Sequence, residues 1–272
     1  MDFGLHGRNA LVVGGSRGIG KAIALVLAEE GMNVALAARD PERLRRAAEE
    51  IQPATGVRVA TLTCDVRSRE SVDQMVESAA EALGGLHVLI NSGSAPGGSP
   101  TAIGRIETIV DEAFLDDFDV KYLGALRCAR AVIPHLKRAG WGRIVNISGL
   151  NARVAGNLSG GARNTALVHL TKTLAMQLGR DGITVNCIHP GITRTERTTE
   201  LLAERAAREG RTVRELEQAD YAPGSPRGNA IGRMVDAREV AYLAAFLCSD
   251  RAWAVTGEVI AAGGGVGNAV YY

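Results

Sequence analysis

The sequence predicts a single α/β domain of the doubly wound Rossmann type, with a parallel sheet covered by helices on both faces. Short β-branched segments alternate with longer helical segments along the 272 residues, and the 33 glycines gather at turns between them. The first such segment runs directly into a glycine-rich turn and a helix. Parallel neighbouring strands need crossover connections, so this alternation indicates right-handed βαβ units.

Seven strands are expected from short apolar runs bounded by turn residues. They cover 9–13, 33–38, 57–66, 86–91, 143–147, 183–188 and 258–261. Helices are expected over 19–30, from Pro41 onward, over 68–83, in a long stretch that follows the loop 93–100 and ends near 139, over 162–178 and over 239–248. Apolar residues recur at helical spacing in these segments, for example at Ile19, Ile23 and Val26. Asp40 before Pro41 is a typical helix start.

Residues 192–231 interrupt this alternation. The segment is polar and charged, has no strand signal, is helical in part over 200–217 and is turn-rich over 221–226. Long connections in compact domains usually have a function, and ligands bind at the carboxyl edge of such sheets. We expect residues 1–272 to form one domain, with residues 192–231 as a mobile substrate lid. The alternative is that this segment is an ordinary surface loop.

Composition excludes several classes of protein. Thirty-one basic and 30 acidic residues leave a net charge of +1, which gives no field to attract nucleic acid or an anionic membrane. No apolar run approaches the ~20 residues of a spanning helix, and residues 1–10 do not resemble a signal peptide. We therefore expect a cytoplasmic protein. Four scattered cysteines without metal-binding spacing predict buried, reduced thiols and no metal site.

A glycine-rich loop follows the first expected strand. Glycines let the backbone turn tightly and approach a pyrophosphate, and the helix N-terminus offers free N–H groups. The candidate cofactor-binding residues here are Gly14, Ser16, Arg17, Gly18, Ile19 and Gly20. Residues 15–21 also match most of an ATP-binding loop pattern, but Ala22 lacks the hydroxyl that would hold magnesium. An ATPase is therefore disfavoured.

Arginine stands at the end of the second expected strand, where an NAD site would place a carboxylate for the ribose 2′-hydroxyl. This residue is Arg39, and Arg17 is available in the glycine loop. Two guanidinium groups can bind a 2′-phosphate from two sides. We expect the cofactor to be NADP, and the alternative is that Arg39 only reaches solvent from a strand end.

The sequence resembles the short-chain dehydrogenase/reductase family over nearly its whole length. The matching stretches are VVGGSRGIG, CDV, LINSG, GRIVNISG, LTKTLA, ITVNCIHPG and a C-terminal stretch that ends in TGEVI. The resemblance implies a Rossmann fold with seven parallel strands, a small-molecule substrate and a homodimer or homotetramer. It also implies cofactor contacts near the adenine, the ribose and the nicotinamide, in that order, at Asp65 and Val66, at Asn91 and Gly93, and at Pro190, Gly191 and Thr195.

The catalytic residues depart from the family pattern. Members that reduce carbonyls use a serine, a tyrosine, a lysine four residues later and an asparagine on the preceding long helix. Ser148 matches the serine, whereas Gly160 and Asn164 stand at the tyrosine and lysine positions. Lys121 stands at the asparagine position, and no tyrosine occurs between Ser148 and Tyr221. The resemblance thus implies cofactor chemistry without the usual proton donor.

Lys121 falls inside the apolar arc of its expected helix. An ammonium that points inward is costly without a partner, so Lys121 either faces the active site, where it replaces the missing lysine or donates the proton, or pairs with Asp117 and reaches solvent. The sequence leaves both interpretations open. The candidate catalytic residues are Ser148, Lys121 and Asn164.

Four other residues are weaker candidates. Arg163 is a possible anion-binding residue, although a surface position is favoured. His189 precedes the nicotinamide segment and is a second candidate acid, whereas His169 is expected to pack within its helix. Tyr221 in the expected lid is a further candidate acid.

Three functions are compatible with the sequence. The first is an NADP-dependent oxidoreductase that acts on a small carbonyl or an activated double bond, with Ser148 as hydrogen-bond donor and Lys121 or water as proton source. The second is a redox-neutral enzyme on the same scaffold, and the third is a non-catalytic NADP-binding protein. The phosphate loop and the nicotinamide segment favour the first, whereas the missing tyrosine and lysine favour the others.

Overall fold

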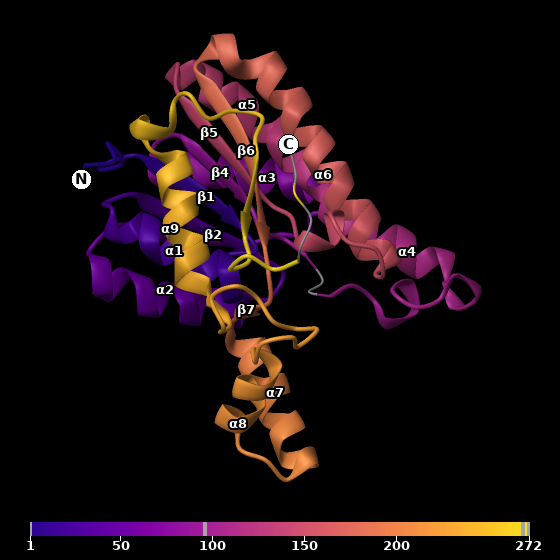
Figure 1. Ribbon diagram of the computed structural model, residues 1–272. Helices are drawn as coiled ribbons and strands as arrows, with labels where there is room; N and C mark the ends of the chain where they lie inside the picture. The colour runs from indigo at the N-terminus through magenta and orange to yellow at the C-terminus, as the bar shows by residue number, and fades with distance from the viewer. Residues whose placement is uncertain (1, 95–96, 268–269, 271–272) are drawn as a thin grey trace.

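The computed structural model describes residues 2–94, 97–267 and 270, and a seven-stranded parallel sheet lies at its centre (Figure 1). The strands are β1 (Asn9–Val13), β2 (Asn33–Ala38), β3 (Val59–Thr63), β4 (Val88–Asn91), β5 (Gly142–Ile147), β6 (Ile183–Pro190) and β9 (Val259–Ala262). Their order is β3-β2-β1-β4-β5-β6-β9. All strands are parallel, but the chain adds β2 and β3 on one side of β1 and β4 to β9 on the other. The switch point of this order lies between β1 and β4, where α/β folds of this kind bind ligands. The predicted fold class is confirmed.

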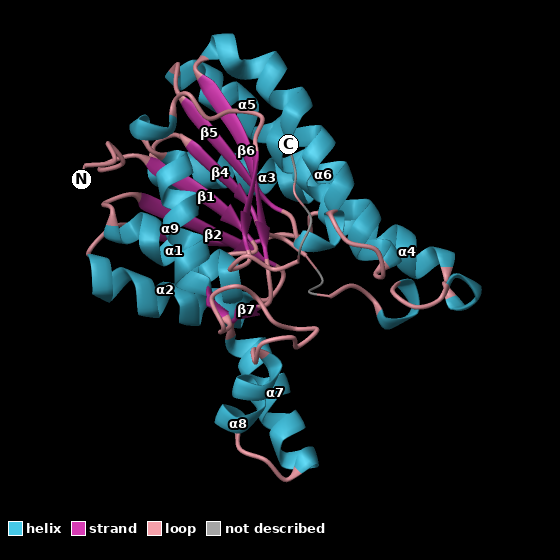
Figure 2. Ribbon diagram, in the orientation of Figure 1, coloured by secondary structure: helices cyan, strands magenta, loops and turns pink. Residues whose placement is uncertain are grey.

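Helices cover both faces of this sheet (Figure 2). One face packs against α1 (Gly18–Glu29), α2 (Pro41–Thr55) and α9 (Ala237–Cys248). The other packs against α3 (Arg69–Leu83), α5 (Gly124–Ala139) and α6 (Leu158–Leu178). Successive residues of a strand point to opposite faces, so Val12 belongs to the first core and Leu11 to the second. Burial on both faces explains the apolar runs within the central strands, such as residues 10–13 of β1.

Several predicted elements differ from the structure in extent. The helix expected over 162–178 begins at Leu158, because Asn157 caps it there. The strand expected over 57–66 is limited to Val59–Thr63, because this edge strand pairs with β2 over those residues alone. The strand expected over 86–91 begins at Val88, and the loop expected over 93–100 includes residues 95 and 96, which lie outside the described part of the chain. The helix expected to end near residue 139 is divided into α4 (Asp111–Phe118), a π-helical turn (Asp119–Leu123) and α5.

Residues 192–231 form a helical hairpin that projects from the carboxyl edge of the sheet (Figure 1). Its helices are α7 (Glu196–Glu209) and α8 (Val213–Asp220). They enclose a small core of their own, formed by Leu202, Ala206, Leu216, Tyr221 and Met234. The expectation that no strand occurs here was wrong, because β7 (Thr193–Arg194) pairs with β8 (Val235–Asp236) at the base of the hairpin. A strand of two residues has no alternation that a sequence pattern could reveal.

Two local expectations, the cap of α2 and the burial of the cysteines, are confirmed. Asp40 caps α2 by accepting hydrogen bonds from the backbone N–H groups of Glu42 and Arg43. All four cysteines are buried and free. Within the described ranges, no helix is long and apolar enough to cross a membrane, and no group of three or more side chains is placed to bind a metal ion.

Candidate active site

The glycine loop between β1 and α1 is built for close backbone contact. A Cβ atom at Gly20 would lie 2.1 Å from the carbonyl oxygen of Gly14, and a Cβ at Gly14 would lie 2.7 Å from the backbone of Ser92. Gly14 also has a positive φ of 80°. Glycine is therefore required at both positions, and the turn presents the N-terminus of α1 at the carboxyl edge of the sheet. Ser16 and Ile19 lie half-buried on this loop.

An anion already occupies the N-terminus of α1. The carboxylate of Glu196, at the start of α7, accepts a hydrogen bond of 2.9 Å from the backbone N–H of Gly18. Its other oxygen lies 2.8 Å from the Nζ atom of Lys21. The carboxylate is thus held by a helix N-terminus and by an ammonium. A phosphate group would be held by the same contacts in a phosphate-binding loop. The loop thus fits the pyrophosphate of a dinucleotide.

Arg17 and Arg39, the two residues expected to bind a 2′-phosphate, are both exposed. Arg17 and Arg39 form no ion pair within the described residues. Hydrogen bonds from Arg67 lower the pKa of Asp65, and the charge of Arg39 adds to this effect, so Arg39 lies close to the end of β3. The two arginines are therefore available to an additional phosphate, in agreement with the expected preference for NADP.

Three expected cofactor-binding residues share one small cavity with Lys121 at the carboxyl ends of β1 and β4. The cavity is lined by Val13, Val66, Asn91, Gly93, Val120, Lys121, Gly124 and Ala125. A Cβ at Gly124 would lie 2.8 Å from the Cγ2 atom of Val66, so glycine lets α5 approach this segment. The structure thus brings the expected ribose contacts next to a candidate catalytic residue.

A chain of buried amides supports this cavity. The Nδ2 atom of Asn91 donates to Oδ1 of Asn146 at 2.9 Å, and Nδ2 of Asn146 donates to the hydroxyl of Thr171 at 2.9 Å. The chain connects β4, β5 and α6. Sequence reasoning missed Asn146 and Thr171, because their partners lie far apart along the chain. A fully buried network of this kind fixes the relative positions of the elements that carry the site.

The nicotinamide segment lies against the phosphate loop. Pro190 ends β6, and Gly191 packs so closely that a Cβ there would lie 2.8 Å from the Cα atom of Gly263. Thr195 caps α7, and its Cγ2 atom lies 3.5 Å from the position of a Cβ at Gly18. The two segments that the family resemblance assigns to the cofactor therefore adjoin in space.

The structure brings Lys121, Ser148 and Asn164 together. The Nζ atom of Lys121 donates to the carbonyl oxygen of Ile147 at 2.6 Å, and the hydroxyl of Ser148 donates to the backbone carbonyl of Asn164 at 3.0 Å. The Nδ2 atom of Asn164 lies 2.7 Å from the position of a Cβ at Gly149. These contacts join the π-helical turn, the end of β5 and the first turns of α6.

Lys121 points into the protein, with 6% of its surface exposed. The interpretation in which it pairs with Asp117 and reaches solvent was wrong, since no carboxylate of the described residues lies within ion-pair distance of its Nζ atom. Burial and the nearby charge of Arg163 lower the pKa of Lys121 to about 7. At neutral pH the amine and the ammonium are therefore both populated, as proton transfer requires.

Asp117 is instead the partner of two serines. It accepts hydrogen bonds from the hydroxyl of Ser159 at 2.6 Å and from the backbone and hydroxyl of Ser99, each at 2.9 Å. Burial opposes its ionisation, but these bonds and the charge of Arg163 lower the pKa of Asp117. The favoured surface position for Arg163 was wrong, because this residue is only 4% exposed. The negative charge of Asp117 compensates the buried positive charge of Arg163.

Gly160, the position at which the family resemblance implies a tyrosine, has no room for a larger side chain. Gly160 is buried in the first turn of α6, and its N–H donates to the Oδ1 atom of Asn157 at 2.6 Å. A Cβ at Gly160 would lie 2.8 Å from the side chains of both Asn151 and Asn157. The space that a larger side chain would enter is thus filled by two amides.

The other candidate acids are less suited to proton donation. His189 is buried, and burial together with the charges of Arg153 and Lys121 lowers its pKa to about 4, so the imidazole is neutral at physiological pH. His169 is exposed, which corrects the expectation that it packs within α6. Tyr221 lies in the core of the α7–α8 hairpin, where burial raises its pKa.

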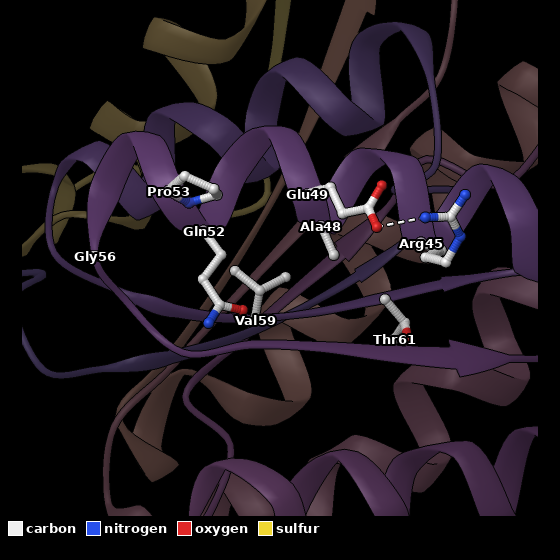
Figure 3. Close-up of a pocket in the computed structure, with 8 residues that line it drawn as sticks. All are labelled: Arg45, Ala48, Glu49, Gln52, Pro53, Gly56, Val59 and Thr61. Atoms are coloured by element: carbon white, nitrogen blue, oxygen red, sulfur yellow. Dashed lines mark hydrogen bonds and ion pairs between the residues drawn. The ribbon is translucent and has the colours of Figure 1, made fainter.

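A shallow hollow elsewhere in the molecule is unrelated to this site. It lies between α2 and the edge strand β3, and Figure 3 shows its lining by Arg45, Ala48, Glu49, Gln52, Pro53, Gly56, Val59 and Thr61. Arg45 and Glu49 in this hollow form an ion pair with each other. None of the candidate residues lines it.

Known proteins resemble this chain over almost its full length. Residues 13–267 match the family described as enoyl-(acyl carrier protein) reductase. A putative ketoacyl reductase of Streptomyces coelicolor is 34% identical over 263 residues, which covers 95% of this chain and 97% of that protein. The NADPH-dependent reductase BacG of Bacillus subtilis is 32% identical over 264 residues, which covers 95% of this chain and 97% of BacG. The solved structure of L-sorbose reductase from Gluconobacter frateurii, in complex with NADPH and L-sorbose, superimposes with a TM-score of 0.88. Its sequence is 32% identical, and the match covers 97% of this chain and 98% of that one.

Proposed function

The chain belongs to the short-chain dehydrogenase/reductase family, and we propose that it is an NADPH-dependent reductase of a small carbonyl compound or activated double bond. Lys121 would supply the proton that the family's tyrosine otherwise provides. The observation that carries this proposal is a buried lysine beside Ser148 whose pKa is lowered to about 7. A relative described as an NADPH-dependent reductase and a similar structure complexed with NADPH support the choice of cofactor.

Residues along the carboxyl edge of the sheet are suited in their chemistry to hold NADPH. The N-terminus of α1 would hold the pyrophosphate, and Arg17 and Arg39 would hold the 2′-phosphate. When bound, NADPH supplies a hydride to the electrophilic carbon of the substrate. The ribose would contact Asn91 and Gly93, at the end of β4. The nicotinamide would contact Pro190, Gly191 and Thr195, which follow β6 at the same edge of the sheet.

Lys121 completes the reaction on the oxygen side. As the substrate carbon accepts a hydride, the π electrons of the carbonyl move to oxygen, and the ammonium of Lys121 transfers one proton to it. The products are an alcohol and a neutral amine, which regains its proton from water. The carbonyl of Ile147 orients the ammonium, while Ser148 and Asn164 line the same corner of the site. We also propose that residues 192–231 act as the substrate lid.

Consumption of NADPH tests this function. Purified protein is mixed with NADPH and a panel of ketones, quinones and enones, and NADPH absorbance is followed for wild type, Lys121→Met and the control Lys172→Met. Lys172 is an exposed lysine of α6, with 59% of its side chain accessible, so we expect its loss to leave turnover unchanged. We expect Lys121→Met to lose about 100-fold or more in kcat, the usual scale of general acid catalysis, while it still binds NADPH.

A second function is favoured by one observation. The space at Gly160 is closed, and the resemblance implies that Gly160 and Asn164 replace the family's tyrosine and lysine. A redox-neutral enzyme or a non-catalytic NADP-binding protein would need neither residue. Tight NADPH binding without consumption on any substrate of the panel would support that alternative and contradict the reductase. A cytoplasmic location and a homodimeric or homotetrameric assembly also stay predictions.

A further inference from the structure

The ammonium of Lys121 has unused hydrogen-bonding capacity. An ammonium carries three N–H donors, and within the described residues only the carbonyl oxygen of Ile147 accepts from it. The side chain is almost fully buried and adjoins the cavity that Asn91 and Gly93 also line. Buried donors and buried charge without partners are costly, so a ligand that supplies acceptors here would be bound favourably.

The surroundings of Lys121 are also short of negative charge. Arg163 on α6 repels it, and the neutral imidazole of His189 contributes no counter-charge. The thiol of Cys187 is held in its protonated form, because burial raises its pKa to about 11. Asp117, the acid of this region, already accepts hydrogen bonds from Ser99 and Ser159. The site therefore holds a cation whose counter-ion the described residues do not provide.

We propose that the substrate is a 2-oxo or 3-oxo acid, whose carboxylate is the missing counter-ion of Lys121. This inference rests on the proposed reductase function. In such acids a carboxylate oxygen and the keto oxygen lie close enough for one ammonium to donate to both, which uses the two remaining N–H groups of Lys121. The N–H that points to the keto oxygen is then already aligned for proton transfer as the hydride arrives.

A neutral substrate satisfies this site less well. A methyl ester of the same oxo acid offers the keto oxygen but carries no charge, so the ammonium stays uncompensated in a buried environment. The carboxylate also raises the pKa of the ammonium when it binds, which keeps the proton on Lys121 until the alkoxide forms. Charge, rather than the size of the substrate, is thus the property that this corner of the site selects.

Matched substrate pairs test the inference during turnover. Acetoacetate and 2-oxobutanoate are each compared with their methyl ester, with NADPH in excess and at about pH 6, where Lys121 is charged. We expect kcat/KM to be about tenfold or more higher for at least one acid than for its ester. Equal values, or a preference for the esters, would overturn the oxo acid assignment while the reductase function would stand.

A binding experiment tests it without turnover. Protein saturated with NADP⁺ is titrated calorimetrically with malonate, which carries two carboxylates in a 1,3 relation, and with the neutral malonamide. We expect malonate to bind about tenfold or more tightly, and Lys121→Gln to remove the difference. Lys121→Arg keeps the charge and should keep part of the preference, and the surface control Lys172→Gln should keep all of it. Equal affinities, absent binding of both probes, or a preference that persists in Lys121→Gln would refute the inference.

Discussion

Glu196 and Gly18 are 178 positions apart in the sequence, yet the carboxylate of one accepts a hydrogen bond from the backbone N–H of the other. Glu196 is the first residue of α7, directly after Thr195 of the nicotinamide segment. The base of the α7–α8 hairpin is therefore tied to the N-terminus of α1. Any anion that binds at that terminus has to displace this carboxylate or share its donor.

Replacement of this carboxylate should strengthen cofactor binding. Glu196→Gln keeps the size of the side chain but removes the charge that competes with and repels a pyrophosphate. We expect the dissociation constant of NADPH to fall about two- to fivefold, as suits one charge at a helix N-terminus. Fluorescence titration measures it, with Glu204→Gln on the exposed surface of α7 as control. An unchanged or weaker affinity for NADPH in Glu196→Gln would show that the two anions do not compete.

Arg39 should determine the choice between the two nicotinamide cofactors. Arg39→Asp replaces a guanidinium that has no ion-pair partner within the described residues by a carboxylate that suits a ribose 2′-hydroxyl. We expect NADPH binding to weaken about 10- to 100-fold while NADH binding is spared. Arg46→Asp, an equal change of charge on the exposed face of α2, serves as control. If both cofactors lose affinity equally, Arg39 does not read the 2′-phosphate.

Local patterns predicted the fold well because they report local physics. Apolar spacing located the helices and strands, and the turn of Gly14 and Gly20 was predicted because only glycine permits that backbone approach. The π-helical turn around Lys121 has no comparable pattern, since a single wide turn leaves helical spacing almost unchanged. The burial of Arg163 was not predictable either, because its compensating charge, Asp117, comes from another helix.

The reduction rate should depend on the protonation of Lys121. Burial and the charge of Arg163 lower its pKa to about 7, while His189 and Cys187 nearby stay neutral near that pH. Because the ammonium is the proton donor, kcat/KM, which reports the protein before substrate binds, should be highest below about pH 7 and fall as the pH rises through that value. Profiles of kcat/KM against pH, at saturating NADPH and limiting substrate, measure this. The residual rate of Lys121→Gln should lack the transition, and a wild-type rate that increases through neutral pH would contradict the assignment of the donor.

The same buried lysine should reduce the stability of the fold. The pKa of Lys121 is about 7 in the folded protein, against the ordinary value of 10.5 for a lysine in water, so the unfolded chain binds more protons between these two pH values. The contribution of Lys121 to the free energy of unfolding of the wild type is therefore lowest below about pH 7 and rises towards alkaline pH.

Lys121→Met removes the buried charge, although it also leaves the carbonyl of Ile147 without its donor. We expect the variant to unfold with a free energy about 1–3 kcal/mol higher at about pH 6, and the gain to shrink at about pH 9. Urea unfolding of both proteins at the two pH values measures this. Stabilisation that is equal at both, or a destabilised variant at the lower one, would mean that Lys121 is not a buried cation in the folded protein.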